Sequence, residues 1–234
     1  MKNNTKLILE GAQQLGVFVS EDQISKFLIY LEELKQWNAR INLTAIRGDR
    51  EIIIRHFLDS IAGMAALADL PPSPPPPLGQ GPWSGLPSRV IDVGTGAGFP
   101  GMPIRICRPQ IFLTLLESNK KKVAFLHSLC GTLGLKGIQI LGERLEWLSK
   151  QPSHQGAYDI LMARALRPSM FLAQASHLLR LGGRVVIWAA RAGEELFREL
   201  KDPAVWSQPE VLSYRLPFEG IERNLIVLRK AFHS

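Results

Sequence analysis

The stretch VIDVGTGAGFPGMPI, residues 90–104, constrains the fold of this chain more than any other part of the sequence. An apolar run of strand type ends at Asp92, and glycines follow at positions 94, 96, 98 and 101. Glycines directly after a strand allow a sharp turn and a close approach of the backbone to a ligand. The spacing fits two ligand classes. Residues 96–101 match the G-x-G-x-x-G pattern of dinucleotide-binding proteins, and residues 92–98 suit S-adenosylmethionine (SAM).

Charge and apolar content set the broad class. The chain has 234 residues, of which 46% are apolar, enough for one sizeable domain and a small appendage. A net charge of +7 favours a polyanionic partner such as nucleic acid or an anionic membrane surface, although many soluble proteins are simply basic. No uncharged apolar stretch approaches the ~20 residues that cross a bilayer, and no signal peptide is visible, so we expect a cytoplasmic protein.

The two cysteines, Cys107 and Cys130, are too few for a disulfide framework. Together with His127 they make only a weak metal-binding pattern, because metal sites need convergent ligands at defined spacing. Buried free cysteines are common in protein cores. We therefore expect core cysteines and no bound metal.

Residues 1–70 are predicted to form a helical region packed on the core. Ser20 and Gln23 have the spacing of a capping box, and apolar residues then recur at helical spacing. A second helix is predicted from about Asp49 to Ala68, after a polar turn over residues 37–50. Residues 71–88 hold eight of the sixteen prolines, which predicts an extended connection or a surface loop.

Residues 89–234 show a different pattern of apolar residues. Short apolar runs such as RVIDVG, IFLTLLE, YDILMARA and GGRVVIWAA alternate with helical or turn-rich segments. Near-continuous apolar strands separated by helices indicate a parallel sheet covered on both faces. Two final runs, EVLSYRL and RNLIVLRKA, are joined by a turn short enough to require antiparallel pairing. The predicted fold is α/β: a Rossmann-like sheet of five parallel strands plus a C-terminal antiparallel hairpin, with an N-terminal helical extension.

Three features favour SAM over a dinucleotide. Asp92, two residues before Gly94, would repel a pyrophosphate but can accept hydrogen bonds in a site for a zwitterionic amino acid. The compact dehydrogenase pair Y-x-x-x-K is absent, and little chain remains for a separate substrate domain. The closing hairpin resembles that of a methyltransferase sheet. Gly94 and Gly96 then lie at the cofactor turn, and Glu117, at the end of the next strand, is expected to bind the ribose hydroxyls.

The methyl acceptor is constrained by what is missing. Methylation of exocyclic amines often uses an N/D-P-P-Y/F loop after the fourth strand, where this chain reads MARALRPS. Methylation of pyrimidine carbon 5 needs a cysteine nucleophile, but Cys107 and Cys130 fall on predicted helices away from the strand ends. These absences favour an acceptor atom that is already nucleophilic, so no catalytic residue is assigned.

The segments NLTAI and RHFLDS, followed by DVGTGAGFPG, LLESNKKKVAFL and MARAL, form a specific combination. With them the chain resembles the ribosomal RNA small subunit methyltransferase G family, once called glucose-inhibited division protein B. The resemblance covers about residues 14–230 and departs from the family at the proline-rich stretch. It implies SAM-dependent methylation of guanine N7 in 16S ribosomal RNA, and it implies cofactor contacts at Gly94, Phe99, Leu145, Glu146 and Arg164.

Each implied contact also has a plainer interpretation. Phe99 can pack on the cofactor or be a core aromatic. Leu145 and Glu146 can read the adenine edge or simply begin a helix. Arg164 can hold the cofactor carboxylate or an RNA phosphate, or it can form a surface salt bridge.

Contact with RNA is expected from basic residues around the predicted site, with 16S rRNA or the small ribosomal subunit as partner and the protein acting as a monomer. The candidates are Arg40, Arg47, Arg50, Arg55, Lys120, Lys121, Lys122, Arg164 and Arg167. His56 and Asp59 can serve the target loop, or Asp59 can fix helix packing, which we favour. Two other functions remain open: a non-catalytic SAM-sensing RNA-binding module, and a dinucleotide-dependent oxidoreductase.

Overall fold

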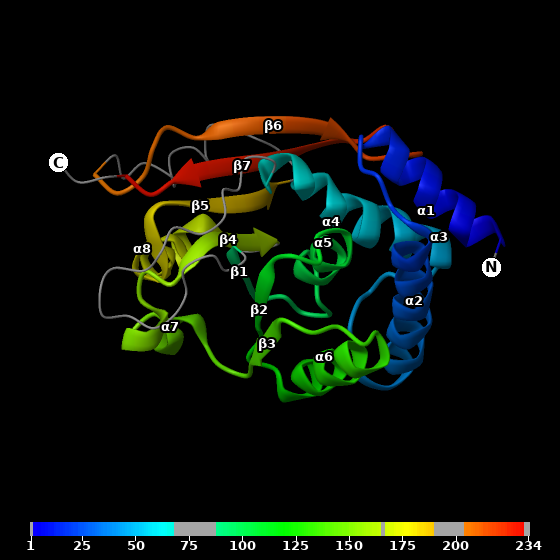
Figure 1. Cartoon of the computed structure of the whole chain (residues 1–234), viewed down its shortest axis with the longest axis horizontal. Helices are drawn as coiled ribbons and strands as arrows, with labels where there is room; N and C mark the ends of the chain where they lie inside the picture. The colour runs from blue at the N-terminus through cyan, green and yellow to red at the C-terminus, as the bar shows by residue number, and fades with distance from the viewer. Residues whose placement is uncertain (1, 68–87, 165–166, 190–203, 232–234) are drawn as a thin grey trace.

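The computed structural model describes residues 2–67, 88–164, 167–189 and 204–231. A seven-stranded sheet runs through the middle of the molecule, with helices on both faces (Figure 1). Its strands are β1 (Arg89–Val93), β2 (Phe112–Leu116), β3 (Ile138–Leu141), β4 (Tyr158–Arg164), β5 (Leu179–Ala189), β6 (Glu210–Arg215) and β7 (Glu222–Arg229). The predicted proline-rich connection over 71–88 lies, except for Ser88, outside the described residues.

The strand order is β3-β2-β1-β4-β5-β7-β6. Strands β1 to β5 pair in parallel, and β7 pairs antiparallel with both β5 and β6. This arrangement confirms the predicted five parallel strands and closing hairpin. The order of the chain reverses between β1 and β4, and ligands of such sheets bind beyond the carboxyl ends of the strands at that point.

The central strands are apolar along nearly their whole length because both faces of the sheet are covered. One face is packed by α7 (Leu145–Leu148) and α8 (Leu172–Leu178). The other face is packed by α5 (Gly101–Cys107), α6 (Lys120–Thr132) and the N-terminal helices, whose side chains share one continuous hydrophobic core with it. The edge strand β6 is exposed or half-buried along its length.

The N-terminal region consists of α1 (Lys2–Gln14), α2 (Glu21–Ile41) and a longer helical run. The predicted capping box is confirmed: the Ser20 side chain accepts from Gln23 N, and the Gln23 side chain accepts from Ser20 N. The predicted turn over 37–50 is wrong at both ends. Helix α2 continues to Ile41 and ends at Asn42, whose left-handed φ of 46° makes it the C-cap. The next helix already includes Asp49 and Arg50.

The second predicted helix is a continuous run of four helical segments, of three types, over residues 49–67. It consists of α3 (Asp49–Ile52), the π-helical η1 (Ile53–Leu58), α4 (Asp59–Ile61) and the 3₁₀-helical η2 (Ala62–Leu67). Short 3₁₀ turns also occur at η3 (Pro152–His154) and η4 (Pro168–Met170). A π-helical turn widens the helix and changes the direction of its side chains, and such turns are frequent at functional sites. Here the π turn faces the carboxyl end of β4.

Candidate methyltransferase active site

The loop after β1 takes the conformation that its glycines allow. Gly94, Gly96 and Gly98 have φ values of 66°, 62° and 95°, in the region that side chains rarely adopt. Asp92 is fully buried beneath this loop, and its Oδ2 accepts hydrogen bonds from Thr95 Oγ1 at 2.6 Å and Gly101 N at 2.7 Å. Asp92 therefore ties the start of the loop to the first turn of α5.

The second carboxylate oxygen of Asp92 behaves differently. Oδ1 is buried and makes no hydrogen bond among the described residues. Burial raises the pKa of Asp92 to about 7, against the hydrogen bonds from Thr95 and Gly101, which lower it. A buried acceptor without a hydrogen bond costs free energy in the folded protein. A ligand that donates a hydrogen bond to Asp92 Oδ1 would remove this cost.

Glu117 follows β2 directly, as the sequence predicts. Its Oε2 accepts from Gly96 N at 3.0 Å, and its Oε1 accepts from Asn119 N at 2.8 Å. Each carboxylate oxygen can accept a second hydrogen bond, which leaves capacity for hydroxyl donors. Glu117 thus fixes the middle of the glycine loop from the neighbouring strand, and Asn119 caps α6 through Lys121 N and Lys122 N.

Phe99 is held within a column of rings rather than at the surface. Its ring stacks on Tyr30 of α2, with centroids 5.3 Å apart, and on His56 of η1, with centroids 4.5 Å apart. The Tyr30 hydroxyl donates to the carbonyl of Ala97. Phe99 is only 8% exposed, an environment that matches the core-aromatic interpretation. The N-terminal helices therefore support the glycine loop from behind.

Leu145 and Glu146 open α7, the helix that follows β3. Leu145 packs into the core beneath the sheet, whereas Glu146 is exposed. The N–H groups of Leu145 and Glu146 have no partner within the helix, as at any helix start, whereas those of Trp147 and Leu148 donate to the main-chain oxygen of Arg144. Both residues lie on a strand-to-helix connection of the sheet, but no contact joins them to Glu117 or the glycine loop among the interactions described here.

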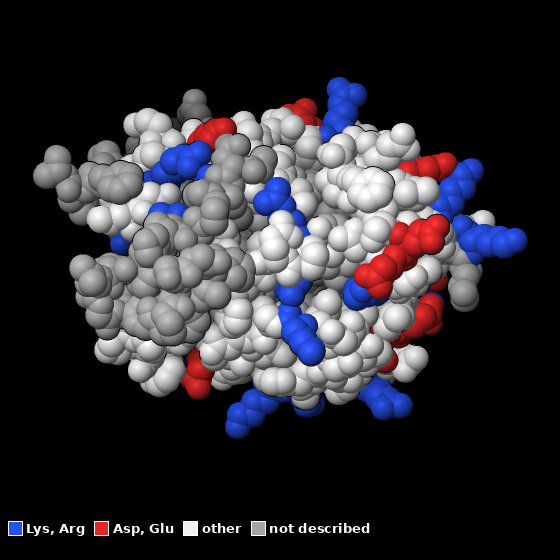
Figure 2. Space-filling view, in the orientation of Figure 1, with Lys and Arg blue, Asp and Glu red and all other residues white. Residues whose placement is uncertain are grey.

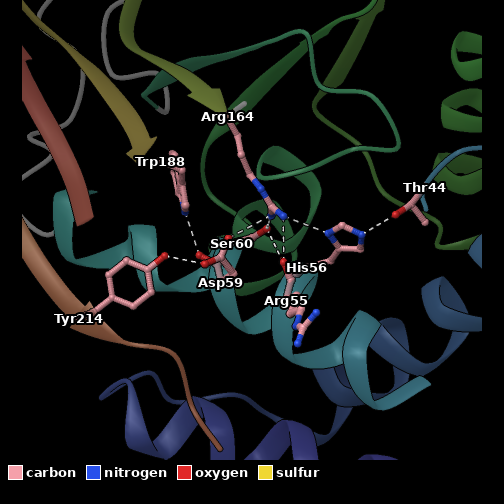
Figure 3. Close-up of polar contacts among 8 residues, drawn as sticks. All are labelled: Thr44, Arg55, His56, Asp59, Ser60, Arg164, Trp188 and Tyr214. Carbon is pink, nitrogen blue, oxygen red and sulfur yellow. Dashed lines mark hydrogen bonds and ion pairs between the residues drawn. The ribbon is translucent and has the colours of Figure 1, made fainter. Parts of the chain in front are cut away.

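Arg164 ends β4 and reaches across to the helical run of residues 49–67 (Figure 3). Its Nη2 donates to the main-chain oxygen of Arg55 at 2.8 Å and lies 3.0 Å from His56 Nδ1. Its Nη1 lies 3.3 Å from Asp59 Oδ2 and 3.5 Å from Ser60 Oγ. Arg164 does form a salt bridge, but its partner is Asp59 in the helical region and the pair is largely buried. The side chain is only 20% exposed.

Asp59 and His56 belong to this same cluster. Asp59 Oδ1 accepts from the Tyr214 hydroxyl at 2.7 Å, and its main-chain oxygen accepts from Trp188 Nε1 at 2.8 Å. His56 Nε2 lies 2.8 Å from Thr44 Oγ1. Burial, and secondarily the charge of Arg164, lowers the pKa of His56 to about 3. Asp59 therefore fixes helix packing, the interpretation that we favoured.

Several members of the site were missed by sequence reasoning. Tyr30 has the spacing of an ordinary core residue on α2, and Thr44, Trp188 and Tyr214 carry no local pattern that points to the site. Lys122 is not one of these, because it belongs to the basic residues that the sequence predicts around the site. Its Nζ lies 3.9 Å from the place that a Cβ on Gly96 would take, so this ammonium stands over the glycine loop.

The candidate RNA contacts do not form one cluster of free cations. Arg55 pairs with Glu219 at 2.8 Å, and the Arg50 guanidinium lies over the Phe218 ring. Other members are exposed, namely Arg40, Arg47, Lys120, Lys121 and Arg167. In Figure 2 the described Lys and Arg side chains are spread over the visible face, with acidic residues between some of them. We find no single basic patch on that face.

Three further features of the described residues concern metal binding, the cysteines and membrane spanning. Within 2–67, 88–164, 167–189 and 204–231, no three His, Cys, Asp or Glu side chains gather as metal ligands. Burial raises the pKa of the Cys107 thiol to about 12 and that of Cys130 to about 11, so neither is a ready nucleophile. No helix among these residues is long and apolar enough to span a bilayer.

Comparison with known proteins identifies the family. The model of the GidB family, described as rRNA small subunit methyltransferase G, matches residues 23–226. The chain belongs to this family. A ribosomal RNA small subunit methyltransferase G of Acetivibrio thermocellus is 36% identical over 228 residues, covering 96% of this chain and 88% of the relative. The methyltransferase G of Deinococcus deserti is 35% identical over 236 residues, covering 97% and 88%.

Solved structures support the fold of this methyltransferase G family member. TrmN from Thermus thermophilus matches with a TM-score of 0.53 at 19% identity, over 76% of this chain and 53% of that one. A predicted O-methyltransferase from Agrobacterium tumefaciens matches with a TM-score of 0.50 at 16% identity, over 62% and 75%. At such identities the likeness concerns the sheet and its helices alone. With family membership established, the dinucleotide-dependent oxidoreductase is no longer a candidate.

Proposed function

We propose that this protein transfers a methyl group from SAM to N7 of a guanine in 16S ribosomal RNA. Family membership supports an rRNA methyltransferase of the small subunit. The observation in the site that carries the proposal is the pair of buried carboxylates, Asp92 and Glu117, on either side of the positive-φ glycine loop. A pyrophosphate would be repelled at such a place, whereas an ammonium group and ribose hydroxyls are hydrogen-bond donors that these oxygens can accept.

The residues present fit SAM at this loop. The unpaired, buried Oδ1 of Asp92 is an acceptor for the amino group of the cofactor, and Glu117 keeps capacity for the ribose hydroxyls. Gly94 and Gly96 form the cradle, with the other proposed contacts at Phe99, Leu145, Glu146 and Arg164. Phe99 acts in this proposal from behind the loop, since its buried ring stacks on Tyr30 and His56.

When bound, SAM supplies an electrophilic methyl group on a sulfonium. Guanine N7 has an in-plane lone pair and carries no proton at neutral pH, so no residue of this chain has to remove one. The burial of His56 and Asp59 in the Arg164 cluster agrees with this, because neither is free to act as a general base. The chain's contribution is to orient two substrates and exclude water, which can supply on the order of 7–11 kcal/mol.

We further propose that the protein acts in the cytoplasm as a monomer on 16S rRNA or the small subunit, with residues 1–70 as a helical region and 89–234 as the methyltransferase domain. The exposed target base of such a reaction is best presented by a single-stranded or loop guanine. The exposed members of the basic set would then contact phosphates, which give affinity without sequence choice.

A transfer assay tests the proposal. The purified chain is incubated with methyl-labelled SAM and either naked 16S rRNA or small ribosomal subunits from cells that lack the protein, and label in RNA is counted. We expect multiple turnovers on at least one substrate. Calorimetric binding of SAM without any transfer to either substrate would instead favour the SAM-sensing RNA-binding module.

A further inference from the structure

His56 contacts two parts of the proposed active site with one ring. Its face stacks on Phe99 in the glycine loop, with an interplanar angle of 14°. Its edge places Nδ1 3.0 Å from Arg164 Nη2 and Nε2 2.8 Å from Thr44 Oγ1 (Figure 3). The glycine loop follows β1 and Arg164 ends β4, two strands that pair in parallel, so His56 contacts both connections from the helical region.

The chemistry of the partners fixes the tautomer of His56. A guanidinium nitrogen has no acceptor lone pair, so in the contact with Arg164 the imidazole Nδ1 must accept. A neutral imidazole then carries its proton on Nε2, which donates to Thr44 Oγ1. An imidazolium would direct an N–H at the guanidinium and lose this contact. The lowered pKa of His56 agrees with a neutral ring, because burial and Arg164 both disfavour the charged form.

Thr44 is itself held firmly enough to orient the ring. Its N donates to Asn38 Oδ1 and its O accepts from Asn38 Nδ2, both at 2.9 Å. Thr44 Oγ1 also accepts from Ile46 N at 3.1 Å. His56 of the segment RHFLDS therefore contacts both Thr44 of the segment NLTAI and Phe99 of the glycine motif, although these segments are separate in the sequence.

Arg164 depends on this imidazole for one of its contacts. Its remaining partners are the main-chain oxygen of Arg55, Ser60 Oγ and the single carboxylate of Asp59, which also accepts from Tyr214. These contacts bind both Nη atoms of Arg164 to residues 55–60 of the helical run. Among the described interactions, the Nε–H of Arg164 has no partner. The orientation of this donor at the carboxyl end of β4 is therefore set by the groups that hold the Nη atoms.

We propose that His56 is a positioning residue for methyl transfer: its neutral ring holds Phe99 and the glycine loop with its face, and it orients the Arg164 guanidinium with Nδ1. This inference rests on the proposed function, in which the loop binds SAM and Arg164 contacts the cofactor. The two tasks use different parts of the ring, so they can be separated by substitution. His56 itself touches no substrate in this scheme.

Two variants divide the tasks. His56→Phe keeps an aromatic face for Phe99 but removes the acceptor for Arg164. His56→Asn keeps a side-chain oxygen at about the reach of Nδ1 but removes the ring. His127→Phe and His127→Asn, at an exposed position of α6, are the matched controls. SAM affinity is measured by calorimetry, kcat and KM by transfer of labelled methyl groups, and folding by thermal unfolding.

We expect His56→Phe to lower kcat by about tenfold or more, with a smaller loss of SAM affinity through the released Arg164. We expect His56→Asn to do the reverse, weakening SAM binding by about tenfold with a smaller effect on kcat. Equal losses of kcat and affinity in both variants, or no loss in either, would overturn the proposal and leave His56 as a packing residue. Activity in neither the parent nor any variant would contradict the proposed function instead.

A spectroscopic measurement needs no variant. In the ¹⁵N-labelled parent protein, imidazole nitrogen shifts report which nitrogen carries the proton. We expect the Nε2–H tautomer of His56 throughout the range from about pH 6 to 8, where an ordinary histidine titrates. A ring that titrates in this range, or one protonated at Nδ1, would overturn the inference even if His56→Phe fails to fold or no RNA substrate is methylated.

Discussion

Glu117 at the end of β2 accepts a 3.0 Å hydrogen bond from the main-chain N–H of Gly96 in the loop after β1. The two residues follow neighbouring parallel strands, so the contact closes the glycine loop over the carboxyl ends of the strands. The other carboxylate oxygen of Glu117 accepts a hydrogen bond from Asn119 N, so both oxygens act as acceptors. A glutamine in the same place would turn a donor toward one of these N–H groups.

Replacing Glu117 by Gln tests this closure. The amide must direct its NH₂ at either Gly96 N or Asn119 N, so one donor loses its acceptor. We expect SAM affinity to fall by about tenfold or more and the free energy of unfolding to fall by about 1–3 kcal/mol. Calorimetry and urea unfolding measure the two effects. Glu143→Gln, on an exposed part of the β3–α7 connection, is the control, and equal behaviour of both variants would exclude the proposed role.

Asp92 makes stability depend on pH in an unusual direction. Because burial raises its pKa from 3.8 to about 7, the folded protein holds a proton that the unfolded chain has lost between these pH values. The contribution of Asp92 to stability is thus greatest at low pH and is lost as pH rises toward 7, with a slope of up to about 1.4 kcal/mol per pH unit.

The variant Asp92→Asn removes this titration. We expect the free energy of unfolding of the parent, measured with urea between about pH 5 and 8, to fall relative to that of Asp92→Asn as pH rises. Parallel pH profiles would show that Asp92 titrates at an ordinary pKa.

The lysines that open α6 should differ in function. Lys122 Nζ stands over Gly96, whereas Lys120 and Lys121 are exposed. An ammonium beside the cofactor loop attracts an anionic group such as the carboxylate of SAM. We therefore expect Lys122→Ala to weaken SAM binding by about three- to tenfold. Lys121→Ala is the matched control. If the two variants bind SAM with the same affinity, Lys122 does not contact the cofactor, and all three lysines face solvent or RNA.

Gly98 tests how closely the loop packs on the N-terminal helices. A Cβ there would lie 2.6 Å from the Tyr30 hydroxyl and 2.8 Å from Met102 Cγ, at a φ of 95°. Gly134 also has a positive φ, of 61°, but a Cβ at that position meets nothing within 4 Å. We expect Gly98→Ala to cost at least about 1–2 kcal/mol more stability than Gly134→Ala. Equal losses in urea unfolding would show that backbone strain alone matters.

Local patterns in the sequence predicted much of the fold. The strands of the sheet, the closing hairpin and the Ser20 capping box follow from apolar runs and from residues a few positions apart, which is where sequence signals are strongest. The end of α2 could not be read in this way. It is set by Asn42, whose left-handed conformation stops a helix that the polar residues after Trp37 do not stop.

The site was predictable only in part, for a physical reason. The glycine turn and Glu117 are fixed by strand ends, and parallel strands bring their ends together in a known way. The partners of Arg164 come from a helical run about a hundred positions earlier in the chain, and the π-helical turn that presents them has no local signature. Phe99 was ambiguous for the same reason, since its neighbours Tyr30 and His56 lie on separate helices.

The central claim is methylation of guanine N7, and the identity of the methylated nucleoside tests it most directly. Small ribosomal subunits, or their RNA, from cells lacking the protein are methylated with labelled SAM, digested to nucleosides and separated by chromatography. The account predicts that the label runs with 7-methylguanosine and that the modified RNA breaks at one guanine under N7-methylguanosine-specific chain cleavage. Label in N2-methylguanosine, or in any other methylated nucleoside, would contradict it.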